Sequence, residues 1–69
     1  MINIRHDTIV RAGDFLTPAS GNEKWQVKSI TGIKITITNT ISKLEKIIQK
    51  NDLIIQRWTL EIGNGRGYW

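Results

Sequence analysis

The sequence predicts an all-β domain, namely a small barrel of about five antiparallel strands. Thirteen isoleucines stand beside four leucines and two alanines, and β-branched side chains fit a pleated strand better than a helix. Several short segments also alternate apolar and polar residues, which is the period of a half-buried strand. The 69 residues suffice for one domain at most. We predict a single small domain over 1–69, with an N-terminal arm at 1–7 and a Gly-rich C-terminal tail at 63–69.

The first predicted strand covers 9–16 and is broken at Ala12-Gly13-Asp14. Asp14 is expected to form a turn there, because a short carboxylate side chain accepts hydrogen bonds from nearby backbone. A second turn-rich stretch, 18–22, follows the strand and is expected to be an exposed loop.

The clearest prediction is a β-hairpin over 24–38. Residues 33–38 alternate strictly, so Ile33, Ile35 and Ile37 are expected on one face and their polar neighbours on the other. The segment 24–28 alternates in the same way. Gly32 lies between the two runs and can take the positive φ that a tight turn requires.

The segment 41–52 supports two interpretations. Ser42 and Glu45 match a capping box, and the apolar residues that follow have helical spacing, which indicates a helix at 42–50. With a period of two, the same residues form a short strand followed by a tight turn at 50–52. The helical interpretation leads to an alternative fold, an α+β domain in which one short helix at 42–50 crosses a curved antiparallel sheet.

The last predicted strand covers 54–62, where apolar and polar residues alternate again. Trp58 lies on its apolar face. Phe15 and Trp25 are in phase with apolar neighbours in the same way, so all three aromatic residues are expected in the core.

This order of elements resembles the small SH3-like barrels of bacterial and phage proteins. The resemblance covers roughly 9–62. These positions belong to the core and the turns, so the resemblance implies a fold and no particular activity. The residues that carry it are Gly13-Asp14-Phe15, Trp25, Val27, Ile35-Thr36-Ile37, Asp52-Leu53-Ile54 and Trp58.

The composition argues against catalysis. The chain has no cysteine and one histidine, His6, so it offers neither a thiolate metal site nor a His-based nucleophile. The six carboxylates are scattered along the chain. The run 63–67 has the glycines of a phosphate-binding loop but no helix after it. We therefore predict no catalytic residue, no metal ligand, no cofactor and no enzymatic activity.

The charge pattern points to a binding surface. The formal net charge is +4. Four basic residues fall on the outward faces of three predicted strands, among hydroxyl side chains, and such a face suits phosphate contacts. The same lysines could equally keep a small sheet soluble and block pairing at its edges. The four residues are Lys24, Lys28, Lys34 and Arg57.

The C-terminal tail combines a cation with two aromatic side chains: Arg66, Tyr68 and Trp69. Three interpretations stay open. The aromatic rings stack on nucleic-acid bases, they anchor in a pocket of a partner protein, or the tail folds back over the open end of the barrel.

We conclude that the chain is a non-enzymatic binding module. Nucleic acid is the first expected partner because of the sign of the charge, and a host protein is the alternative, for a regulator or inhibitor of the phage or mobile-element type. A homo-oligomer built on an exposed isoleucine such as Ile30 or Ile55 is a third reading. No apolar run is long enough to span a membrane, so we expect no membrane partner. We expect a cytoplasmic location.

Overall fold

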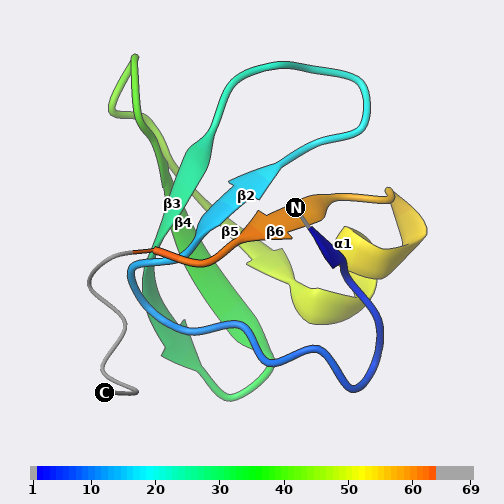
Figure 1. The fold of residues 1–69 in the computed structure, drawn as a ribbon. Helices are drawn as coiled ribbons and strands as arrows, with labels where there is room; N and C mark the ends of the chain where they lie inside the picture. The colour runs from blue at the N-terminus through cyan, green and yellow to red at the C-terminus, as the bar shows by residue number, and fades with distance from the viewer. Residues whose placement is uncertain (1, 64–69) are drawn as a thin grey trace.

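The computed structural model describes residues 2–63, which form one antiparallel six-stranded sheet and one short helix (Figure 1). The strand order in the sheet is β1-β6-β2-β3-β4-β5. The elements are β1 (Ile2–Asn3), β2 (Phe15–Thr17), β3 (Trp25–Thr31), β4 (Lys34–Asn39), β5 (Glu45–Gln49), α1 (Lys50–Ile55) and β6 (Thr59–Glu61). The predicted mostly-β class is confirmed. Within residues 2–63 no pairing joins the outer strands β1 and β5, so strand pairing does not close the predicted barrel.

The predicted hairpin is confirmed as β3 and β4, and Gly32 adopts φ +60° in its turn. A register shift between Val27 and Ser29 inserts one extra residue into β3, so Val27 faces Ile37 and Ile30 faces Ile35. Because side chains alternate along a strand, this bulge turns Ile30 to the same side as Val27. Ile33 was expected on the core face, but it lies in the turn and its side chain is exposed.

The predicted strand over 54–62 is wrong in its first half, because 50–55 form α1 and only 59–61 pair as a strand. The same helix replaces the turn expected at 50–52. The 42–50 helix is also misplaced, since 45–49 form β5, as the strand interpretation required. Leu53 is fully buried, and this packing favours a helix that two adjacent isoleucines would not form alone.

A Schellman motif ends α1. The amide of Arg57 donates to the carbonyl of Ile54, and the amide of Trp58 donates to the carbonyl of Leu53. Arg57 takes φ +58°, a left-handed conformation that costs a non-glycine residue about 1 kcal/mol. Leu53 and Trp58 are both buried, which supplies the apolar contact that accompanies this cap.

The predicted strand over 9–16 is also shorter than expected, because only 15–17 pair in the sheet. The preceding residues form a long connection from β1 that crosses the molecule beside the lower end of the β3–β4 hairpin (Figure 1). The predicted N-terminal arm contributes β1, which pairs with β6.

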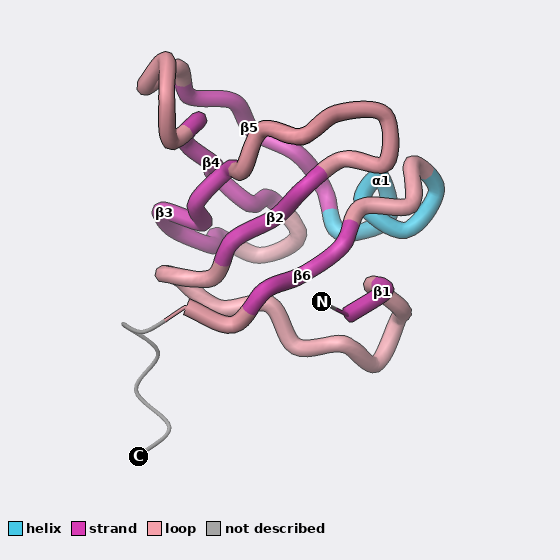
Figure 2. The backbone as a smooth tube through the Cα atoms, turned by 45° about the horizontal axis from the view of Figure 1, so that its top comes forward, coloured by secondary structure: helices cyan, strands magenta, loops and turns pink. Residues whose placement is uncertain are grey.

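The core lies between the two halves of the bent sheet and α1. It combines residues from β2 and β6 with residues from β3, β4 and β5 (Figure 2). Trp58 is buried as predicted, whereas Phe15 and Trp25 are only half-buried. The buried apolar residues are Ile4, Leu16, Val27, Ile35, Ile37, Ile48, Leu53, Trp58 and Leu60.

The Asp14 carboxylate joins the connection before β2 to the end of β6. It is fully buried, and it accepts hydrogen bonds from the amides of Arg11 and Gly63, each at 3.1 Å. Asp14 therefore holds a turn, as the sequence predicts, and also a contact between distant parts of the chain. The backbone of Gly63 packs so closely on Gly13 that a Cβ atom at position 63 would overlap the Gly13 carbonyl.

Replacement of this glycine tests the packing. We expect Gly63→Ala to lower the free energy of unfolding by about 1–3 kcal/mol, because the added methyl must displace backbone. Gly21→Ala is the matched control, since a Cβ atom there meets only the Pro18 side chain, at 3.5 Å. Chemical denaturation of both variants measures the difference, and equal stabilities would contradict the packing at Gly63.

Candidate functional site

Two of the four cations predicted for a basic sheet face are already paired with carboxylates. Nζ of Lys24, just before β3, lies 2.6 Å from Oε2 of Glu61. Nζ of Lys28, at the bulge in β3, lies 2.7 Å from Oε2 of Glu45. Each pair reduces the positive potential that a phosphate would meet on this face.

The other predicted binding residues are distributed differently. Lys34 begins β4 and is exposed, with no ion pair inside the described part of the chain. Arg57 lies in the turn after α1 and not on a strand. The tail residues lie outside the described residues: Arg66, Tyr68 and Trp69.

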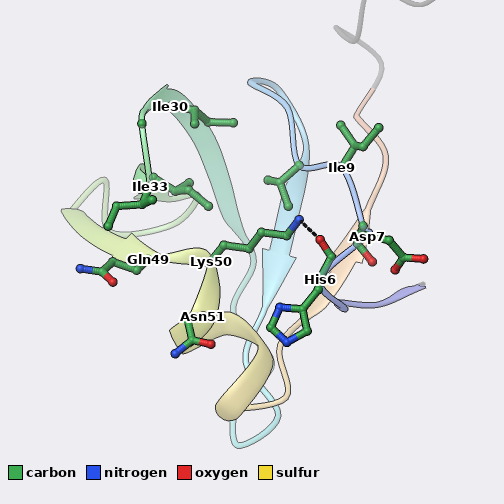
Figure 3. A pocket seen from close by; sticks show the side chains of 12 residues that line it. His6, Asp7, Ile9, Ile30, Ile33, Gln49, Lys50 and Asn51 are labelled. Atoms are coloured by element: carbon green, nitrogen blue, oxygen red, sulfur yellow. Dashed lines mark hydrogen bonds between the residues drawn. The ribbon is translucent and has the colours of Figure 1, made fainter.

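An apolar groove of about 540 Å³ lies between the β1–β2 connection, the tip of the β3–β4 hairpin and the start of α1. Figure 3 shows Ile30 and Ile33 on one side of the groove and Ile9 on the other. These three side chains are 41%, 68% and 62% exposed. The lining residues are His6, Asp7, Thr8, Ile9, Val10, Ile30, Gly32, Ile33, Ile35, Gln49, Lys50 and Asn51.

Lys50 connects two walls of this groove. It is the first residue of α1, and its Nζ donates a hydrogen bond of 2.9 Å to the carbonyl of His6 (Figure 3). Within residues 2–63 it makes no ion pair, so its positive charge is not neutralised by a carboxylate. The groove therefore presents apolar side chains next to one cation.

Sequence reasoning missed this groove because it placed Ile33 on the core face of a strand. The glycine of the hairpin turn was the sequence signal that could have revealed the exposure of Ile33. If Gly32 supplies one residue of a two-residue hairpin turn, its neighbour Ile33 is at the tip and leaves the sheet.

A second, more polar hollow of about 400 Å³ lies where β1 leaves β6. Arg5 and Arg57 both line it, and no carboxylate does. Its lining residues are Asn3, Ile4, Arg5, Ile54, Arg57 and Trp58.

Lys46 is a further cation, exposed but in contact with aromatic rings of the fold. It faces Ile37 across β4 and β5, on the core side of the outer strand. Its Nζ lies 5.2 Å from the ring centroid of Trp25 and 6.0 Å from that of Trp58, so cation–π attraction holds it over the two indoles. A lysine on an outer strand also protects that strand from pairing with another chain.

Residues 2–63 contain no group of three or more His, Cys, Asp or Glu side chains that could hold a metal ion. The described helix is too short to cross a bilayer. Comparison of the chain with protein-family models, with curated proteins and with solved structures gave no match.

The Lys24–Glu61 pair gives a prediction about pH. The hydrogen bond from Lys24 and its positive charge lower the pKa of Glu61 below its ordinary value of 4.5. A lowered pKa stabilises the fold above pH 4.5, and this contribution is lost as the pH falls through the folded-state pKa. We expect Lys24→Met to return the pKa of Glu61 toward 4.5 in an NMR titration of the carboxyl carbon.

Lys28→Met is the control for this titration, because Lys28 pairs with Glu45 instead. It should leave the pKa of Glu61 unchanged. If both variants shift that pKa equally, the effect comes from net charge and not from the pair.

Proposed function

We propose that this chain is a non-enzymatic binding module whose groove takes an apolar segment of another protein that carries a carboxylate. The observation that carries the proposal is the set of three exposed isoleucines around one groove. Exposed apolar surface gathered at a concave site is typical of protein interaction sites. The proposed setting is the cytoplasm, and the proposed role is that of a regulator or inhibitor of a host protein.

The charge at the groove favours an acidic partner. Lys50 stands at the groove without an ion pair in the described part of the chain, and the sequence has a formal net charge of +4. Asp7 also lines the groove, but Figure 3 shows its carboxylate directed away from Lys50. A carboxylate on the partner would therefore find a cation beside its apolar contact, and opposite charges speed encounter and select the partner.

The scaffold we infer for this site is an SH3-like barrel. Strand β6 returns to pair with β2, and α1 lies between β5 and β6 along the chain. This order of elements supports the resemblance seen in the sequence. It would place the groove at one end of the barrel, beside the β3–β4 turn.

A peptide-library selection on the intact chain tests the groove. We expect the enriched peptides to combine large apolar side chains with a glutamate or aspartate. Ile33→Ser should weaken their binding about tenfold, or ~1.4 kcal/mol, because it removes apolar surface that the peptide buries. Ile55→Ser is the matched control, since Ile55 is equally exposed at 68% and does not line the groove.

Three outcomes would contradict the proposal: no enrichment, equal effects of the two serine variants, or enriched peptides that bind Lys50→Gln as tightly as the parent chain. Light scattering of the free chain belongs to the same experiment. If the chain self-associates and Ile33→Ser abolishes the association, the groove is occupied by a second copy and not by a different protein.

Nucleic acid is the second candidate partner, and one specific observation favours it. Arg5 and Arg57 line one hollow without a carboxylate, and Lys34 is also unpaired within residues 2–63. Guanidinium groups of this kind contact backbone phosphates.

We expect a short oligothymidylate to bind more weakly as salt rises. Contacts to two phosphates predict a slope of about −1.4 in a plot of log K against log salt concentration, because each phosphate contact on a single strand contributes about −0.7. Fluorescence anisotropy at several salt concentrations measures this slope. An absence of binding at about 50 mM salt would remove this candidate.

A further inference from the structure

We propose that Arg5 and Arg57 form a binding site for a phosphate group. The first observation is their placement by the sheet register. Strand β1 pairs with β6 so that Ile2 faces Leu60 and Asn3 faces Thr59. Arg5 follows β1 by two residues and Arg57 precedes β6 by two, so this pairing brings both arginines to the same hollow.

Two like charges gathered at one hollow repel each other, and a bound anion would relieve that repulsion. Both arginines line the same hollow of about 400 Å³, and its other lining residues are neutral. The ion pairs of residues 2–63 involve neither guanidinium. An oxyanion in the hollow would neutralise both charges and would accept several N–H donors, which is the geometry that arginine offers to phosphate.

The backbone around the site leaves both side chains available. The amide of Arg5 donates to the hydroxyl of Thr8, and its carbonyl accepts from the Thr8 amide, so a local turn holds this residue. The amide of Arg57 donates to the Ile54 carbonyl in the cap of α1. Both arginines are exposed, and within residues 2–63 their hydrogen bonds involve their backbone atoms only.

The conformation of Arg57 is the second, independent observation. Its φ is +58°, at a helix-cap position that glycine normally occupies. A non-glycine residue held in an unfavourable conformation supports the hypothesis that its side chain has a function. One structural use exists, because a cation near the C-terminal end of a helix interacts favourably with the helix dipole. The two uses predict different behaviour of a glycine variant.

The site is separate from the apolar groove, because the two hollows share no lining residue. It would supply a phosphate contact for the nucleic-acid candidate, but its existence does not depend on that candidate. The shared chemistry is a phosphate group, whether free, on a small molecule or in a polynucleotide backbone.

The test titrates the full chain with two probes, inorganic phosphate and a short oligothymidylate, and NMR monitors binding. We expect inorganic phosphate to shift the Arg5 and Arg57 resonances selectively. Arg57→Gly should weaken phosphate binding at least about tenfold while the melting temperature stays the same or rises, because glycine relieves the left-handed backbone. A purely structural role for Arg57 instead predicts a lower melting temperature with phosphate binding unchanged.

Lys43→Gly is the matched control. Lys43 is also a basic residue with a left-handed backbone conformation, at φ +65°. It lies in the β4–β5 connection, away from α1 (Figure 1), and it does not line the hollow. Lys43→Gly removes one positive charge and relieves a left-handed backbone conformation, as Arg57→Gly does. Because the change is away from the hollow, it should leave phosphate binding nearly unchanged. Arg5→Gln provides a second variant whose backbone bonds to Thr8 are kept.

The outcomes separate the sources of the phosphate. Tighter binding of the oligothymidylate, with the same loss in Arg57→Gly and Arg5→Gln, supports a polynucleotide backbone. Binding of inorganic phosphate alone supports a free or small-molecule phosphate and removes the nucleic-acid candidate. The proposal is overturned if phosphate shifts neither arginine, if Lys43→Gly weakens binding as much as Arg57→Gly, or if acetate binds as well as phosphate.

Discussion

The buried Asp14 carboxylate organises this small domain. A carboxylate without solvent is stable only where hydrogen bonds replace its water, and here the amides of Arg11 and Gly63 donate to it. On the same segment, the amide of Val27 donates to the Asp14 carbonyl, and the amide of Gly13 donates to the carbonyl of Val27. The β1–β2 connection, β3 and the end of β6 are therefore held together at one point.

This junction fixes one end of the long connection before β2, and the hydrogen bond from Lys50 to the His6 carbonyl fixes the other. The chain between these points forms a wall of the apolar groove. The charged side chains are also divided between paired and unpaired positions. Lys24 and Lys28 pair with glutamates, whereas the two arginines at the β1–β6 margin share one hollow without a carboxylate.

Sequence patterns predicted those elements that depend on local alternation. The hairpin formed by β3 and β4, its turn at Gly32 and the burial of Trp58 follow from residue order alone. The helix at 50–55 could not be predicted in this way, because its three polar residues followed by three apolar ones show no clear period, and its stability comes from the burial of Leu53. The bulge at Lys28 was equally hidden, since one inserted residue reverses the facing of every side chain beyond it.

The candidate sites show the same division. By itself the sequence determined a mostly-β class, a positive net charge and a chain with no cysteine and one histidine, because these follow from composition and short-range periodicity. Only the tertiary structure decided which cations are paired and which isoleucines are exposed together. Arg5 and Arg57 are far apart in the chain, and they share a hollow because β1 pairs with β6. Contacts between distant segments depend on register and packing, which no local pattern encodes.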